Sequence, residues 1–314
     1  MVWCRLIVFV LLPALFPAKN VWGQELELIK TTHLPHYPSA SALEYSNNRL
    51  YVMGDDAPYL LVLNRHHRPV DSLGLFPSKE KRIDKATKAD IESATVISTG
   101  TKSFLALFSS FSDTNRNKFV FLELQATGKQ QPAAVVSSSF FKVAGVEETN
   151  LEGSAIINNR LVFSNRANNT HRRNYFIVTD FSKENGITGT PQVVAIDLPQ
   201  TKGVLGISGL DYVAEKDLLL FTASSEDTPN ATSDGTIGDS YLGAIRHISK
   251  KLSGDKIQPD ALVNLSPVIG KMGLQKIESI AVEEVTKTSL LVHLAADNDN
   301  GESTLFKVKL TWKL

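Results

Sequence analysis

The sequence predicts an all-β protein, a five-bladed β-propeller, and three observations support this fold class. From residue 43 onward, short apolar and β-branched runs alternate with Asn, Asp, Gly and Ser turns, and no long stretch has a helical period. One six-residue pattern occurs five times, and a second apolar run follows each copy. The copies are spaced by roughly 50 to 70 residues, which suits a four-stranded propeller blade.

Residues 1–23 are predicted to be a signal peptide rather than part of the fold. One positive charge, Arg5, precedes an apolar run over 6–16 that is too short to span a bilayer. No later run reaches the length of a membrane span, so we expect no membrane insertion after cleavage. The single cysteine, Cys4, lies in this leader. We therefore expect residues 24–314 to form one cysteine-free propeller domain that is secreted or periplasmic.

The six-residue pattern is predicted to form the innermost strand of each blade. It reads apolar, Glu or Ser, small, any, any, apolar, and the first copy matches it least well. Small sheets of this kind protect their edges when they are repeated radially, which favours a closed ring. The five copies are residues 40–45, 91–96, 151–156, 207–212 and 277–282.

The outer strands of each blade follow in chain order. Second strands are expected at 49–53, 104–108, 160–163, 218–221 and 290–294, third strands at 59–63, 118–124, 174–178, 241–248 and 303–310, and fourth strands at 69–75, 133–143, 192–198 and 261–265. The fifth repeat lacks a fourth strand, and residues 26–30 are predicted to supply it and close the ring. Six blades are the alternative, because the interval 222–276 could hold extra strands. A β-sandwich would leave the five equivalent positions unexplained.

The polar residue of the repeat is predicted to point into the central channel and to bind a metal ion. Three crowded carboxylates repel one another, so they stay ionised only beside a cation. Ca²⁺ takes six to eight oxygen ligands, whereas zinc and copper favour His or thiolate. The alternative is that each Glu bonds only to the backbone of the next blade and staples the ring. The predicted Ca²⁺ ligands are Ser41, Glu92, Glu152, Ser208 and Glu278.

Polar residues after each second strand are predicted to surround one mouth of the channel. Arg166 is the main cation among them, and Asp56 and Asp227 are acidic neighbours. For a phosphate ester, the metal and Arg166 would polarise the phosphoryl oxygens while Asp56 or Asp227 orients the attacking water. These three residues are therefore the candidate catalytic groups. The alternative for each Asp is a purely local role in a turn.

Composition narrows the possible partners. The sequence has 33 Lys and Arg against 33 Asp and Glu, so no basic excess favours a nucleic-acid backbone. It contains no Gly-rich phosphate loop, no HExxH, no CxxC and no GxSxG, which leaves serine-esterase and zinc-protease chemistry without support. We expect a monomer that takes a small anionic substrate or a surface ligand.

The ring residues also carry a resemblance to a known family. The order Ser, Glu, Glu, Ser, Glu, one per blade, is similar to the central calcium ring of the calcium-activated nucleotidases, the apyrase family, which hydrolyse nucleotide phosphates. The repeat texture, with Ile91-Glu92-Ser93 and Leu151-Glu152-Gly153 heading strands, also resembles secreted bacterial propellers related to phytase-like esterase domains. These resemblances imply a calcium-dependent phosphohydrolase. The alternative is a non-catalytic binding propeller with a structural calcium ion.

Overall fold

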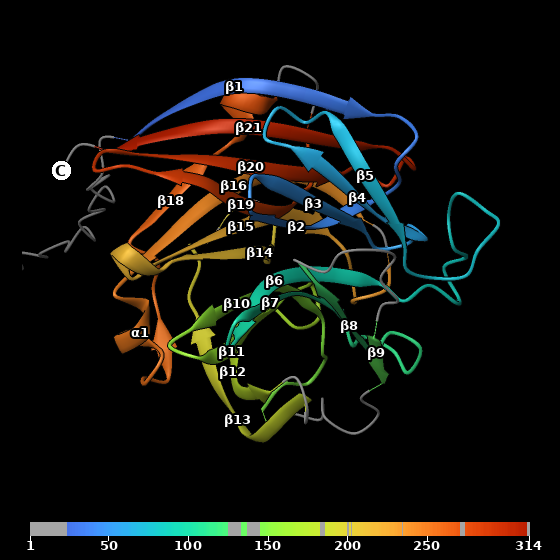
Figure 1. The fold of residues 1–314 in the computed structure, drawn as a ribbon. Helices are drawn as coiled ribbons and strands as arrows, with labels where there is room; N and C mark the ends of the chain where they lie inside the picture. The colour runs from blue at the N-terminus through green and yellow to red at the C-terminus, as the bar shows by residue number, and fades with distance from the viewer. Residues whose placement is uncertain are drawn as a thin grey trace, which may run out of the picture.

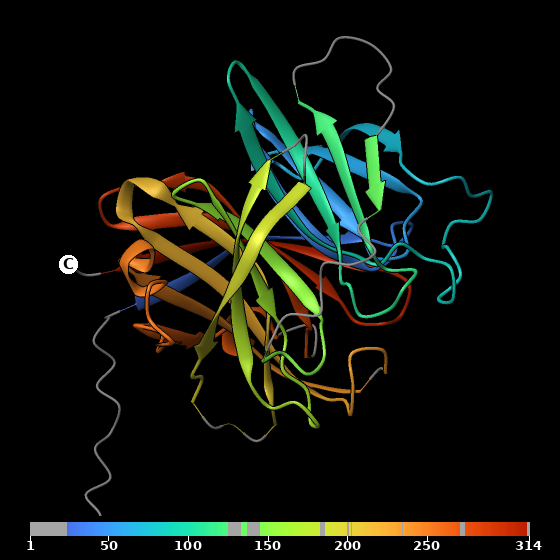
Figure 2. The same ribbon diagram turned by 90° about the horizontal axis from the view of Figure 1, so that it is seen from below.

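The chain folds into five small β-sheets arranged in a ring, seen in a computed structural model (Figures 1 and 2). The structure describes residues 24–124, 133–136, 145–182, 186–199, 201, 203–233, 235–270 and 274–312. The predicted signal peptide lies outside these residues. Within the described chain, no helix has the length and apolar character that a membrane crossing requires.

Each sheet is one blade, with its strands running antiparallel from the channel outward. Blade 1 contains β2 (Ala40–Ser46), β3 (Arg49–Gly54), β4 (Tyr59–Asn64) and β5 (Pro69–Gly74). Blade 2 contains β6 (Ile91–Thr99), β7 (Lys102–Ser109), β8 (Lys118–Glu123) and β9 (Ala133–Val136). Blade 3 contains β10 (Leu151–Ile157), β11 (Arg160–Asn165), β12 (Asn174–Ser182) and β13 (Gly186–Ile196). Blade 4 contains β14 (Leu205–Val213), β15 (Leu218–Asp227), β16 (Thr236–Arg246) and β18 (Ala261–Asn264).

Blade 5 is built from both ends of the chain. Its order is β19 (Ile277–Val285), β20 (Ser289–Asp297), β21 (Ser303–Trp312) and β1 (Gln24–Leu34). The pairing of β1 with β21 confirms the prediction that residues 26–30 complete the fifth blade.

The five-bladed fold is confirmed, and the described residues of the long interval that left six blades open form no additional blade. Between β15 and β19 the chain forms β16, β18 and three short elements: α1 (Ile248–Lys251), β17 (Lys256–Ile257) and α2 (Ser266–Ile269). The two-residue β17 pairs in parallel with β13 at the outer edge of blade 3. The extra length therefore connects neighbouring blades.

A β-bulge lies at the ring position of every innermost strand. The register with the second strand shifts between Ala40 and Ala42, and it shifts at the equivalent place in β6, β10, β14 and β19. A bulge bends the strand and re-aims a side chain, which explains why one polar residue per blade turns toward the channel.

The small residue after each ring position allows neighbouring innermost strands to approach closely. A Cβ atom added at Gly153 would lie 2.3 Å from the carbonyl oxygen of Ser208 in the next blade. A Cβ atom added at Gly209 would lie 2.6 Å from the Cα of Ser279. The sequence pattern of a polar residue followed by a small one therefore describes a bulge packed against the next blade.

Candidate functional site

A polar pocket of about 80 Å³ lies at the predicted mouth, between the first residues of the innermost strands and the ends of the second strands. Among the described residues, Ala167 and Ala231 are the only apolar ones that line it. The described lining also includes eight carboxylates and five cationic side chains: Asp55, Asp90, Glu92, Glu152, Glu226, Glu278, Asp297 and Asp299, with Lys85, Lys88, Arg116, Arg166 and Lys276. The carboxylates are in excess, and the lining is suited to hydrophilic or cationic ligands.

Arg166 occupies one half of this pocket and holds three of the carboxylates. Its Nη1 donates to Glu278 Oε2 at 3.0 Å and to Glu152 Oε2 at 3.3 Å, and its Nη2 donates to Glu226 Oε2 at 2.9 Å. Nη1 also lies 3.4 Å from the hydroxyl of Ser208. The Arg166 side chain is only 6% exposed. We had expected a rim cation, but the guanidinium is buried among the ring residues of blades 3, 4 and 5.

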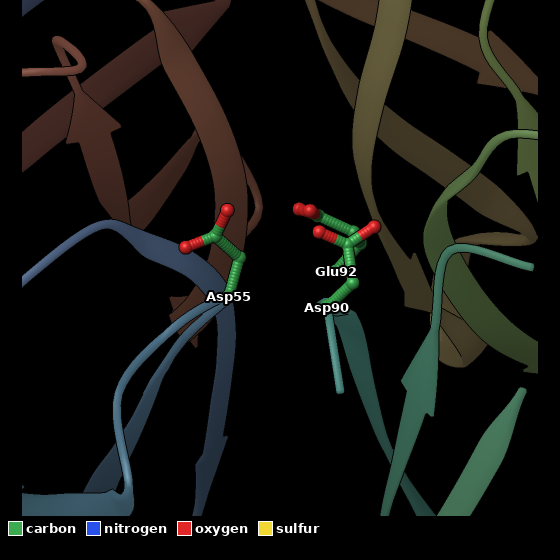
Figure 3. A group of neighbouring side chains, drawn as sticks. All are labelled: Asp55, Asp90 and Glu92. Carbon is green, nitrogen blue, oxygen red and sulfur yellow. The ribbon is translucent and has the colours of Figure 1, made fainter. Parts of the chain in front are cut away.

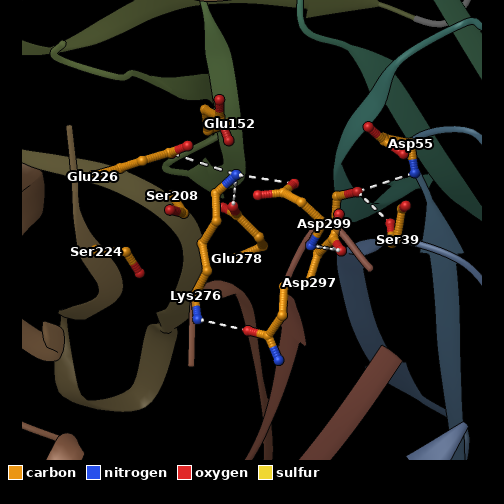
Figure 4. A network of polar contacts seen from close by, with 12 residues as sticks. Ser39, Asp55, Glu152, Ser208, Ser224, Glu226, Lys276, Glu278, Asp297 and Asp299 are labelled. Carbon is orange, nitrogen blue, oxygen red and sulfur yellow. Dashed lines mark hydrogen bonds and ion pairs between the residues drawn. The ribbon is translucent and has the colours of Figure 1, made fainter. Parts of the chain in front are cut away.

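Lys276 adds a second positive charge to the same half. Its Nζ lies 3.1 Å from Glu278 Oε1 and 3.4 Å from Glu226 Oε2 (Figure 4). Burial raises the pKa of Glu278, but Lys276 and Arg166 outweigh burial and the net pKa is lowered. Burial raises the pKa of Glu152 to about 7, although Arg166 opposes this shift. Glu278 is therefore a firmly ionised partner of the two cations, while Glu152 titrates near neutral pH.

The other half of the pocket holds a compact acidic cluster from blades 1 and 2. Ligand oxygens of Asp55, Asp90 and Glu92 all lie within 4.8 Å of one another, and their carboxylates face each other across the gap between the blades (Figure 3). Lys88 contacts Asp55 and lies 2.7 Å from Asp90 Oδ1, and Arg116 donates to Asp90 Oδ2 at 3.1 Å. Asp55 Oδ1 is buried without a hydrogen-bond partner among the described residues.

Burial and mutual repulsion govern the charge of this acidic cluster. Burial raises the pKa of Asp55 to about 6, against the lowering effect of Lys88. Burial, Asp90 and Glu152 raise the pKa of Glu92 well above its ordinary value. When all three carboxylates are ionised, the cluster therefore carries more negative charge than Lys88 balances.

The ring residues make two different sets of contacts in this pocket. Glu152, Ser208 and Glu278 contact Arg166, whereas Glu92 belongs to the acidic cluster. Ser41 donates its hydroxyl hydrogen to the carbonyl of Ser39 at 2.8 Å and accepts from the backbone N–H of Asp55 at 3.0 Å. Three ring residues therefore belong to the half of the pocket around Arg166, and Glu92 belongs to the acidic half.

A second repeating position, which the six-residue pattern does not include, also faces the pocket. It lies two residues before the ring residue, just ahead of the innermost strand in blades 2, 3 and 5. Asp90 belongs to the acidic cluster, the Asn150 side chain donates to Glu152 Oε1 at 2.7 Å, and Lys276 pairs with Glu278. The polar character of these three positions in the repeat was the signal that could have identified them.

The structure places only one of the three candidate catalytic residues in the pocket. Arg166 lines it, but Asp56 and Asp227 are not among its lining residues. Asp56 Oδ2 accepts a hydrogen bond from Arg82 Nε at 2.7 Å. Asp227 is exposed and accepts from the Asn169 side chain.

Comparison with known proteins gives a family and a shared fold. Residues 36–310 match the model of a family of unknown function, DUF6929. No curated protein matches the sequence. Similar solved structures include glutaminyl cyclase of Myxococcus xanthus, with 11% identity over 92% of this chain and 97% of that one and a TM-score of 0.48.

Two other similar structures are an α-L-arabinanase of Cellvibrio cellulosa and virginiamycin B lyase of Staphylococcus aureus. The first has 11% identity, coverage of 88% of this chain and 91% of that one, and a TM-score of 0.46. The second has 10% identity, coverage of 92% and 99%, and a TM-score of 0.37. At such values these likenesses carry no argument about activity.

Proposed function

The chain belongs to the DUF6929 family of unknown function, and we propose that it is a secreted or periplasmic β-propeller that binds Ca²⁺ at the mouth of its channel. The proposal rests on the chain's own residues. Secretion is proposed from the leader-like residues 1–23 alone. The cation site is proposed from the acidic cluster of Asp55, Asp90 and Glu92, which carries the argument.

The chemistry of the cluster fits a hard divalent cation. All three side chains offer oxygen, which Ca²⁺ prefers, and the cluster has neither the His nor the thiolate that favour zinc. Asp55 Oδ1 is buried with no described hydrogen-bond partner, so an ion could use it without breaking an existing bond. A bound ion would also offset the repulsion that raises the pKa of Glu92.

The proposed site differs from the five-residue ring that the sequence suggested. Glu152, Ser208 and Glu278 already contact the guanidinium of Arg166, whose positive charge balances the carboxylates. An ion at the centre of the ring would be repelled by that guanidinium at close range, whereas an ion in the acidic cluster would lie near Lys88 but could use the unpartnered Asp55 Oδ1. We therefore propose Glu92 as the ring residue that binds Ca²⁺, together with Asp55 and Asp90.

Binding rather than hydrolysis is the function that this geometry supports best. The hydrolase hypothesis requires Arg166 to reach a phosphoryl group, but its contacts to three glutamates and a serine engage both terminal nitrogens. Asp56 is likewise bound to Arg82. We propose that the ion and the polar lining together hold a small hydrophilic ligand at the mouth.

Hydrolysis of phosphate esters or nucleotides remains a second candidate, and one observation favours it. Asp297 lines the pocket, is 6% exposed, and has a pKa that burial and the neighbouring Asp55 raise to about 7. A carboxyl group that titrates near neutral pH in a polar pocket is suited to general acid–base catalysis. In that case Asp297, rather than Asp56 or Asp227, would act as the general acid or base.

Thermal unfolding with and without calcium, beside a phosphate-release screen, tests both candidates. Saturating Ca²⁺ should stabilise the wild type by about 2.7 kcal/mol at a hundred times the Kd. Glu92→Gln should lose this stabilisation, whereas Glu215→Gln, an exposed acid at the other end of a hairpin in blade 4, should retain it. Stabilisation without release of phosphate from nucleotides, phytate or simple esters supports the binding propeller. Calcium-dependent release would establish the hydrolase instead, and an unchanged midpoint would contradict the calcium site.

A further inference from the structure

Two buried histidines lie at the junction between blade 1 and blade 5, far along the chain from each other. His67 is in the turn between β4 and β5, and His293 is in β20. They are 3% and 0% exposed. His67 Nε2 lies 2.8 Å from His293 Nδ1, which is hydrogen-bond distance between the two rings.

The partners at both ends of this pair set the tautomers. His293 Nε2 is 2.9 Å from Glu283 Oε2, a close contact without ideal hydrogen-bond alignment. A proton on His293 Nε2 therefore faces a carboxylate, which leaves Nδ1 to accept from His67 Nε2–H. His67 Nδ1 then accepts from the hydroxyl of Thr32 at 3.0 Å. When both imidazoles are neutral, this series of four side chains, Thr32, His67, His293 and Glu283, pairs each donor with an acceptor.

This series joins the first blade to all four strands of the last one. Glu283 is in β19, His293 in β20 and Thr32 in β1, and Lys307 in β21 contacts Glu283. Blade 1 contributes His67 and the turn around it, whose carbonyls accept hydrogen bonds from Lys30 and Lys307. The contacts therefore cross the joint where the two ends of the chain close the ring.

A proton added to either histidine would be repelled by the mostly positive side chains around the pair. The charged and titratable groups around the pair are Lys30 in β1, Tyr45 in β2, Arg65 and His66 in the β4–β5 turn, Glu283 in β19 and Lys307 in β21. Burial lowers the pKa of His67 to about 3, and the His293, Lys30 and Lys307 charges add to this effect. Burial also lowers the pKa of His293, against the attraction of Glu283.

We propose that the His67–His293 pair, anchored by Thr32 and Glu283, is an acid-sensitive latch that holds the ring closed while both imidazoles are neutral and loosens the joint between blades 1 and 5 when they are protonated. Protonation would place hydrogen on both of the ring nitrogens that now face each other at 2.8 Å. That contact would then become a repulsion between two donors.

The direction of the pH effect follows from linkage. Both histidines have a lower pKa in the folded than in the unfolded chain, so the unfolded chain binds more protons below about pH 6.5. Stability is therefore lost as the pH falls, by up to about tenfold in the unfolding equilibrium constant per histidine and pH unit. Asp55, Glu152 and Asp297 have raised pKa values and act in the opposite direction, so variants must be compared at each pH.

Chemical denaturation between pH 7.5 and 5 of matched variants tests the latch. His67→Gln and His293→Gln keep a donor and an acceptor in each position but cannot take up a proton. Each substitution should reduce the pH dependence of the unfolding equilibrium constant by up to about tenfold per pH unit, relative to the wild type. His36→Gln, at an exposed position before β2, should leave it unchanged. Equal pH dependence in the wild type and in both latch variants would overturn the proposal.

A measurement on the wild-type protein avoids relying on the folding of the variants. Imidazole NMR signals of the folded chain should show that His67 and His293 remain neutral between pH 8 and 5. Titration of His67 and His293 near pH 6.5 in the folded chain would overturn the latch, because the proposal requires both imidazoles to stay neutral while the ring is closed.

Discussion

The guanidinium of Arg166 binds carboxylates from three blades: Glu152 of blade 3, Glu226 of blade 4 and Glu278 of blade 5. A planar, permanently charged group with several donors suits such a task better than a lysine would. The carboxylates are 9% exposed or less, so the arginine is a major partner for their charge. At this position a side chain brings positive charge to ring carboxylates that the sequence predicts to be metal ligands.

Replacing this arginine should destabilise the protein strongly. Arg166→Ala leaves three buried carboxylates without their shared partner, and we expect the free energy of unfolding at neutral pH to fall by about 3–5 kcal/mol. The measurement is chemical denaturation beside Arg173→Ala, which removes an exposed arginine from the loop after β11. If both variants lose less than about 1 kcal/mol, the central ion-pair network has no structural role.

The innermost strands show which part of the site a sequence can reveal. The repeated pair of a polar and a small residue identified all five innermost strands, and in the structure it coincides with a bulge in each, because a bulge and a close strand approach impose local demands on residue type. The ion pairs follow no such local rule. Arg166 comes from the end of a second strand and pairs with Glu278, 112 residues later. Pairing across the ring depends on side-chain reach in the folded state, which no spacing in the sequence records.

A glycine in an innermost strand provides a test at the scale of the element. Gly209→Ala would place a Cβ atom 2.6 Å from the backbone of Ser279, so blades 4 and 5 must shift apart. We expect a loss of about 1–3 kcal/mol in the free energy of unfolding. Gly74→Ala is the control, since a Cβ atom there meets nothing within 4 Å. Equal stability of the two variants would show that the innermost strands tolerate extra volume.

At the scale of the whole molecule, ring closure depends on one strand from the beginning of the folded part. β1 pairs with β21 over its length and covers an edge that would otherwise be exposed. Leu26 and Leu28 on β1 pack against the apolar core shared by blades 4 and 5. The sequence predicted this closure because the fifth repeat was one strand short.

Removing β1 should weaken the entire ring rather than one blade. For a chain that starts at residue 35, we expect the unfolding midpoint to fall by roughly 10 °C or more, because a ladder and two leucine contacts are lost. Adding a peptide of residues 24–34 should partly restore the midpoint. An unchanged midpoint in the shortened chain would mean that closure of the fifth blade adds nothing to stability.

Calorimetric titration measures most directly whether the acidic cluster between blades 1 and 2 binds Ca²⁺. Calcium added to metal-free wild-type protein should give a saturable heat with one ion per chain. Glu92→Gln should lose most of that heat, and the exposed-site control Glu215→Gln should keep it. No saturable heat in the wild type, or the same binding in Glu92→Gln, would contradict the account.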